Sequence, residues 1–173
     1  MPRKSVKADK SLYQVVREEE LGLTRAQASE LLGGLSESQI EKIENGKTPA
    51  TPDDVMLMAK GYKKPELCNY FCSKECPIGQ KYVPEVKAKE LPQIVLEMIA
   101  SLNTLNKQKD RLIEITADGR LDTDEMADFA LIQKKLKEIT VSANALQLWI
   151  DNTIAAGKID VEAFEKIVRN EGK

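Results

Sequence analysis

The sequence predicts an all-α protein built in two parts, and three observations lead to this expectation. Only 5% of the 173 residues are aromatic and turn signals are sparse, which favours helices over sheets. The first third of the chain contains short apolar patterns that begin with helix-capping residues. Residues 92–170 instead carry apolar residues at steps of three and four, the period of longer helices.

The chain opens with a basic segment, residues 1–10, which we expect to be a flexible arm. Residues 11–20 predict a first helix whose apolar residues Leu12, Val15 and Val16 share one face. We take residues 11–76 as the first domain.

Two short helical patterns follow, placed end to end and each with its own cap. Thr24 is followed three residues later by Gln27, and Ser36 is followed in the same way by Gln39. A hydroxyl residue and a Gln at this spacing satisfy the free amides at a helix start. Because only a Gly-Gly-Leu turn at 33–35 separates the two helices, they would pack at a steep angle in a helix-turn-helix.

Residues 34–47, with the sequence GLSESQIEKIENGK, resemble the Cro/repressor-type helix-turn-helix family, also called XRE or lambda-repressor-like. The turn glycine, the apolar Leu35, the cap Ser36, the core residues Ile40 and Ile43, and the closing ENGK all fall at the family's spacing. The resemblance covers roughly residues 12–67. It implies a five-helix lambda-repressor-like DNA-binding domain.

The segment 24–34 departs from the family pattern because it is one residue longer than usual, with Gly33 as the extra residue. The small residue that the family places in the middle of this helix is then either Ala28 or Ser29.

The remaining helices of the first domain follow from their own signals. Thr51 caps a fourth helix that begins with Pro52 and two acidic residues, which suit the positive end of a helix. Pro65 opens a short fifth helix that carries the cysteines.

The resemblance implies a bacterial-type, sequence-specific transcriptional regulator that binds double-stranded DNA. The start of the second helix of the pair would face the major groove, where Ser, Gln and Glu side chains can address base edges. The residues implied there are Ser36, Glu37, Ser38, Gln39 and Lys42. Contacts to phosphates are implied for Arg25, Asn45 and Lys47.

The charge distribution leaves a rival function open. The formal net charge is −2, and residues 1–66 contain equal numbers of basic and acidic residues, whereas DNA-binding domains usually present a basic face. Glu37, Glu41 and Glu44 outnumber Lys42 on the implied reading helix. The alternative is an interaction adaptor that kept the helix-turn-helix fold without strong DNA binding.

Three cysteines, Cys68, Cys72 and Cys76, follow one another at steps of four. On a straight helix the outer pair would lie about 12 Å apart, too far for one metal ion. The chain contains no histidine to complete a site. We therefore expect no metal or cofactor and an apolar stripe that faces the core; a zinc site, an iron–sulfur cluster or a thiol-responsive regulator are the alternatives.

Residues 77–91 contain Pro77, Gly79 and Pro84 and no apolar period, so we expect a linker there. Residues 92–173 predict a long helical hairpin with a short third helix at 160–170. Turns at 117–122 and 156–160 would each combine a helix-ending glycine with a capping aspartate.

The hairpin pattern also predicts how it packs. Its apolar seam is expected to consist of Val95, Met98, Leu102, Leu105 and Leu112 on one helix and Phe129, Ile132, Leu136, Ile139, Ala143, Leu146 and Ile150 on the other. Leu131, Leu148 and Trp149 fall off this seam. Covering them favours a homodimer formed through residues 92–170.

Catalytic patterns are missing from the sequence. Without histidine the usual general base near neutral pH is absent, and no glycine-rich loop follows a strand pattern. No apolar run reaches the roughly 20 residues that cross a bilayer, and no signal-peptide pattern opens the chain. We expect a cytoplasmic protein without enzymatic activity.

Overall fold

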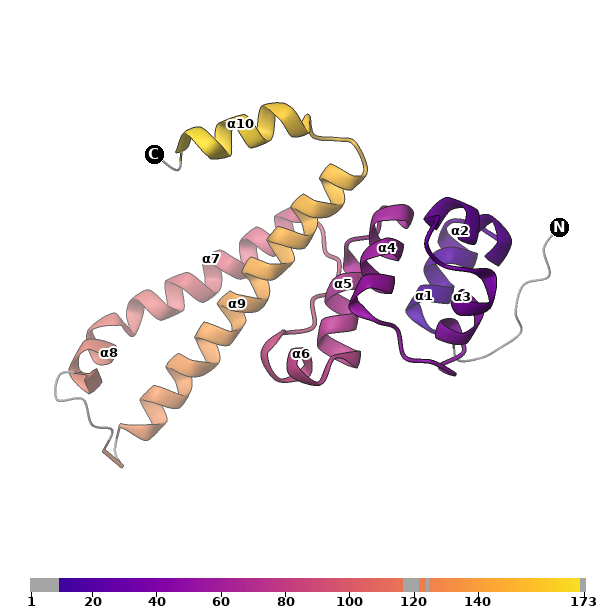
Figure 1. The fold of residues 1–173 in the computed structure, drawn as a ribbon. Helices are drawn as coiled ribbons and strands as arrows, with labels where there is room; N and C mark the ends of the chain where they lie inside the picture. Colours follow the sequence, from indigo (N-terminus) through magenta and orange to yellow (C-terminus); the bar gives the residue numbers. More distant parts are fainter. Residues whose placement is uncertain (1–9, 117–121, 124, 172–173) are drawn as a thin grey trace. The chain divides into compact units, whose positions relative to one another are not determined.

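A computed structural model describes residues 10–116, 122–123 and 125–171, and all the regular structure in these ranges is helical (Figure 1). The fold is therefore the predicted all-α class. The chain divides into two compact units, one of residues 1–85 with 151–173 and one of residues 86–150. The predicted turn at 117–122 lies largely outside the described residues.

The described part of the first unit contains eight helical segments between residues 12 and 82. In chain order these are α1 (Leu12–Gln14), the π-helix η1 (Val15–Glu20), α2 (Arg25–Leu32), α3 (Glu37–Glu44), α4 (Pro52–Tyr62), α5 (Glu66–Tyr70), the π-helix η2 (Phe71–Glu75) and α6 (Pro77–Tyr82). Their buried core draws on every α-helix from α1 to α5. Its largest fully buried members include Tyr13, Ile40, Met58 and Leu67.

The first helix differs from its prediction in the face that it buries. Ser11 caps it, and Val16 is buried as expected, but Tyr13 and Arg17 are buried as well whereas Leu12 is only half-buried. Tyr13, Val16 and Arg17 lie at i, i+3 and i+4, so the buried face keeps the helical period and is displaced by one residue from the predicted face. The segment ends in π-helical hydrogen bonding, in which the amide of Leu21 reaches back five residues to the carbonyl of Val16 (3.0 Å).

The segment expected to be a linker contains helix α6. Cys76 is extended, ends η2 and caps α6, its Sγ accepting a hydrogen bond from the amide of Gly79 (3.5 Å). Gly79 is buried because α6 folds back against η2. A Cβ at position 79 would lie 2.0 Å from the carbonyl oxygen of Cys72, so only glycine fits.

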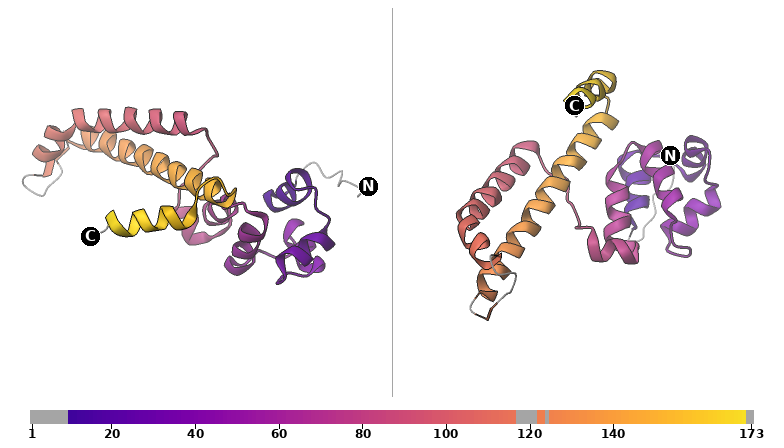
Figure 2. Two further views of the ribbon diagram at one scale, coloured as in Figure 1. Left: turned by 90° about the horizontal axis from the view of Figure 1, so that it is seen from above. Right: turned by 60° about the vertical axis from the view of Figure 1, so that its left-hand side comes forward.

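Helix α7 (Leu91–Lys107), α8 (Lys109–Thr116) and most of α9 (Met126–Ala155) form the second unit. In both views of Figure 2, α7 and α9 run side by side as the two arms of a hairpin. Arg111 of α8 bonds to Asp128 near the start of α9 (2.7 Å). The short third helix is present as α10 (Val161–Glu171), which belongs to the first unit and not to the hairpin.

The predicted hairpin seam is partly wrong. Ile132 is buried as expected, but Phe129 and Leu136 are 40% and 48% exposed, and Leu148, placed off the seam, is buried. The inner face instead includes Ile94 and two small polar residues, Ser101 and Ser142. Because serine is polar, these inward-facing positions do not stand out as core residues in the sequence. The spacing of the large apolar residues therefore predicted a neighbouring face of each helix as the inner one.

None of the described helices combines the length and apolar character needed to span a membrane.

Candidate nucleic-acid interface

The turn between α2 and α3 has the geometry that the two helices require. Gly33 takes a left-handed conformation (φ 64°) and ends α2, a conformation that glycine adopts without strain. Leu35, 3% exposed, anchors the turn in the core. The structure also settles the position of the small residue: Ala28 is fully buried, whereas the Ser29 hydroxyl donates to the carbonyl of Leu35 (2.7 Å).

Both predicted capping boxes are confirmed. At α3 the amide and hydroxyl of Ser36 donate to Oε1 of Gln39 (2.9 and 2.8 Å), and the amide of Gln39 donates to the Ser36 hydroxyl (3.3 Å). Thr24 and Gln27 make the same exchange at α2. The carbonyl oxygen of the Gln39 side chain is thus engaged within the protein, and its NH2 group is the part that remains for an outside partner.

The start of α3 is an exposed polar surface on a rigid support. Ser36, Glu37, Ser38 and Gln39 are all exposed, whereas Ile40 (1% exposed) and Ile43 (7% exposed) are fixed in the core. Lys42 is also exposed, one turn further along the same helix. The residues implied for base contacts therefore lie together on α3, and the buried residues on the opposite side of that helix hold it against the core.

Glu44, one of the three acids that argued against DNA binding, does not face solvent. Its carboxylate accepts hydrogen bonds from Nε and Nη2 of Arg17 (2.5 and 3.0 Å) and from Nε of Arg25 (2.9 Å), and its side chain is 0% exposed. Burial acts to lower the pKa of Arg17, but the hydrogen bond and charge of Glu44 outweigh it and raise that pKa. This buried cluster joins α3 to η1 and to the start of α2.

The buried cluster also changes the role of Arg25. The sequence assigned it to phosphate contact, whereas its Nε is used by Glu44 and its side chain is one-third exposed. The terminal nitrogens at this helix start are the part of Arg25 that could meet a phosphate. Arg17, which the sequence analysis did not single out, holds the cluster from the other side; a lone arginine on an apolar helix face was the available signal.

The remaining implied contacts lie at the far end of α3. Asn45 ends the helix and is half-buried, and Lys47 is exposed. Lys47 lies 3.5 Å from the half-buried Glu41, with which it forms an ion pair. Of the three acids on α3, Glu44 is buried and Glu41 pairs with a lysine, whereas Glu37 is exposed at the helix start.

The three cysteines lie on neighbouring segments: Cys68 on α5, Cys72 on η2 and Cys76 at the cap of α6. All three are half-buried, and burial raises the pKa of the Cys68 thiol, with smaller contributions from Cys72 and Asp151. Within the described residues no three Cys, Asp or Glu side chains come together in a group that could hold a metal ion. A raised thiol pKa also lowers the reactive thiolate fraction near neutral pH.

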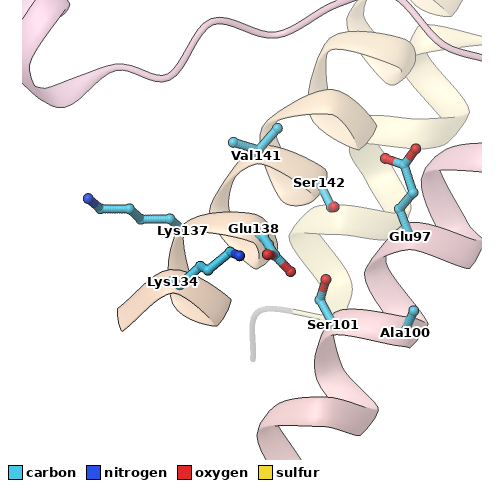
Figure 3. Close-up of a pocket in the computed structure, with 8 residues that line it drawn as sticks. All are labelled: Glu97, Ala100, Ser101, Lys134, Lys137, Glu138, Val141 and Ser142. Carbon is cyan, nitrogen blue, oxygen red and sulfur yellow. The ribbon is translucent and has the colours of Figure 1, made fainter. Parts of the chain in front are cut away.

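A groove of about 530 Å³ lies between α7 and α9 on one side of the hairpin (Figure 3). Ser101 and Ser142 lie at its base, and its two carboxylates are paired with lysines: Glu97 with Lys89 and Glu138 with Lys135 (2.6 and 2.7 Å). These contacts lower the pKa of both carboxyl groups. Lys134 and Lys137 also line the groove and add two positive charges to it.

Comparison with known proteins points to the same part of the chain. Residues 16–67 match a family model described as Helix-turn-helix, which covers η1 through the buried Leu67. No curated protein and no solved structure matches the chain.

Proposed function

Residues 16–67 form a helix-turn-helix domain of the Cro/repressor (XRE) type, a family that binds double-stranded DNA, and from this we propose that the protein is a sequence-specific transcriptional regulator. The start of α3 enters the major groove and reads base edges. The family's domain is regulatory rather than catalytic.

One observation carries the proposal: the polar residues 36–39 are exposed on a helix whose opposite side is fixed in the core. Base readout needs side chains that are free to meet base edges and a support that holds them in register. Ser38 and Glu37 have no capping role and are the principal readers. Gln39 contributes through its NH2 group, because its oxygen serves the capping box.

The burial of Glu44 supports DNA binding because it removes one negative charge from the surface that meets the phosphates. Lys42 and Lys47 then provide backbone contacts from α3 and its end, with Asn45 and the outer nitrogens of Arg25 beside them. A domain with so few cations binds weakly at moderate salt, since phosphate contacts supply much of the affinity.

Selection from random DNA duplexes with the full chain, at low and at moderate salt, tests the proposal. We expect one enriched motif at low salt. The double variant Glu37→Ala with Ser38→Ala, which keeps the capping box, should select a relaxed motif, since each lost base contact costs about 1–3 kcal/mol. Lys47→Ala should instead weaken binding to all sequences and leave the motif unchanged.

A second function remains a candidate on a specific observation, the equal numbers of basic and acidic residues in 1–66. An adaptor that kept the fold would retain no duplex, even at low salt. Failure to enrich any motif together with failure to retain DNA would favour this adaptor over the regulator.

The regulator also acts as a homodimer. One domain of this size covers one half-site, and a two-fold dimer doubles its contacts on a palindrome. We place the means of association in residues 92–170.

A further inference from the structure

We propose that the groove between α7 and α9 binds a small phosphate monoester, whose phosphate meets Lys134 and Lys137 and whose apolar body lies along the groove. This inference goes beyond the proposed function, because every residue that lines the groove belongs to the second unit. The protein would then carry a small-molecule site separate from its DNA-binding domain.

The groove has the size of a small-molecule site. Its volume of about 530 Å³ falls within the range of roughly 300–1,000 Å³ that is usual for such sites. Small side chains leave this space open, namely Ala100 and Ser101 on α7 and Ser142 on α9. Larger side chains at the two serine positions would fill it, so the space follows from the residues present.

The two carboxylates that line the groove already have partners. Glu97 accepts a hydrogen bond from Lys89 (2.6 Å). Glu138 accepts one from Lys135 (2.7 Å) and another from the Ser101 hydroxyl. An anion that enters the groove therefore meets carboxylates whose negative charge is compensated by neighbouring lysines.

Two further lysines of the groove have no such partner. Lys134 and Lys137 are exposed, and neither forms an ion pair within the part of the chain that the structure describes. Residues three apart on a helix are neighbours, with about 5–6 Å between their Cβ atoms, so one anion can meet both ammonium groups. Lys137 extends outward from α9 in Figure 3, and its flexible stem allows it to turn toward the groove.

These two positive charges favour a phosphate monoester over a carboxylate. A phosphate monoester carries a charge of about −1.5 to −2 at pH 7 and three strong acceptor oxygens. It therefore balances both lysines, whereas a carboxylate balances one. Lysine is also a common phosphate ligand in proteins.

The next residues along α9 set the length of the ligand. Val141 and Ser142 follow Lys137 by four and five residues, which is about 6–8 Å along the helix axis. Val141 is half-buried and provides an apolar wall.

Ser142 provides a polar group at the far end of this stretch. It is 6% exposed, its hydroxyl points into the space between α7 and α9 in Figure 3, and no other described residue forms a hydrogen bond with that hydroxyl. A buried hydroxyl without a partner is costly, and a polar group on the ligand would satisfy it. The ligand that fits is therefore a phosphate monoester with one ring between the phosphate and a second polar group.

An NMR titration of the full chain without DNA, with 4-hydroxyphenyl phosphate as the probe, tests the proposal. We expect the backbone signals of residues 97–101 and 134–142 to shift. The double variant Lys134→Gln with Lys137→Gln should raise the dissociation constant at least about tenfold, because a hydrogen bond to a charged group is worth about that factor or more. Lys107→Gln with Lys109→Gln removes two charges from the same unit outside the groove and should leave the binding unchanged.

Related probes and variants separate the contributions of the ligand's parts. Hydroquinone lacks the phosphate and 4-hydroxybenzoate replaces it with a single charge, so both should bind more weakly. Phenyl phosphate lacks the second polar group, and its disadvantage should disappear in Ser142→Ala. Ala100→Glu should bind the probe more weakly than Ala100→Gln, which adds a side chain of the same size to the groove without the negative charge.

Several outcomes would overturn the proposal. One is the absence of shifts in the groove at millimolar probe, or shifts confined to α3, where the exposed lysines of the reading helix could hold a phosphate instead. Another is an affinity that survives the loss of Lys134 and Lys137, or that is matched by hydroquinone or 4-hydroxybenzoate. Since no DNA is present, each result is independent of whether the protein selects a DNA motif.

Discussion

At the scale of single residues, the buried carboxylate of Glu44 does most to fix the reading helix. It holds Arg17 and Arg25 and is fully shielded from water. Glu44→Gln removes the negative charge while keeping the side-chain shape, so the buried guanidinium of Arg17 loses its counter-charge. We expect a loss of about 3–5 kcal/mol in the stability of the first unit, the usual cost of breaking a buried pair.

Hydrogen exchange of peptides from η1 and α3 measures this loss in the full chain. Glu41→Gln is the matched control on the same helix, since Glu41 pairs with the exposed Lys47 and its loss should cost less than about 1 kcal/mol. Equal protection in both variants would contradict the role of the buried cluster.

Tyr62 provides a pH-dependent prediction. Its hydroxyl is buried and has no hydrogen-bond partner among the described residues, and burial, together with the charge of Glu44, raises its pKa from 10.0 to about 12. The folded state therefore holds this proton where the unfolded chain has lost it, so the stability of the first unit falls as pH rises from 10 toward 12.

Tyr62→Phe removes both the unpaired hydroxyl and this titration. We expect the variant to be about 1 kcal/mol more stable near neutral pH, the order of the cost of an unpaired buried group. Its advantage over the wild type should stay constant up to pH 10 and grow above it, as followed by urea unfolding at several pH values. An advantage that shrinks above pH 10 would contradict the prediction, because it would show that folding lowers the pKa of Tyr62.

At the scale of the elements, the packing of α6 on η2 depends on the missing side chain of Gly79. A Cβ there would meet the backbone carbonyl of Cys72, which cannot rotate away. Gly79→Ala should therefore displace α6 and cost about 1–3 kcal/mol, as overpacking does. Faster amide exchange across residues 71–82 would report the displacement.

Gly34→Ala is the control because the added Cβ would meet the end of a flexible side chain, Leu57 Cδ1 at 2.9 Å, which is partly exposed and can turn aside. Its effect should be smaller and confined to the contact of the turn with α4. If both variants exchange like the wild type, α6 is not held by this close approach.

The elements that sequence predicted well are those specified by local chemistry. The capping boxes at Thr24 and Ser36 depend on residues three apart, so the residues alone specify them. The elements that it missed depend on distant partners. Helix α6 requires the contact between Gly79 and Cys72, and the inner face of the hairpin depends on Ser101 and Ser142, which a pattern of large apolar residues does not reveal. In the candidate interface, the exposure of residues 36–39 followed from the family pattern, whereas the burial of Glu44 required its tertiary partner Arg17.

At the scale of the whole molecule, self-association should determine the length of the DNA site that the protein prefers. A dimeric chain should prefer two inverted half-sites whose centres lie about 10–10.5 base pairs, or a multiple of this, apart. Ile99→Glu puts a charge on an exposed apolar residue of α7, within the region 92–170 to which we assign dimerisation. This variant should lose most of its affinity for the palindrome and keep its preference for the half-site sequence. Titration of both proteins onto full and half operators measures the difference, with Ala100→Glu as the control.

A half-site affinity that falls along with the palindrome affinity would show that the variant damages the reading domain itself. Equal palindrome affinities of the monomeric variant and the wild type would show that dimers play no part in recognition.

The double duty of Gln39 bears on how such a regulator can acquire new target sequences. Its side chain lies at the reading surface and also closes the cap of α3. Ser38 and Glu37 can be exchanged during divergence with little effect on the fold, so target preference can drift at these two positions. At position 39 a replacement must still accept hydrogen bonds from Ser36, which restricts it to residues such as Glu. Any other replacement at position 39 would require a different residue to cap α3. Changes in the preferred DNA sequence are therefore easiest at Glu37 and Ser38.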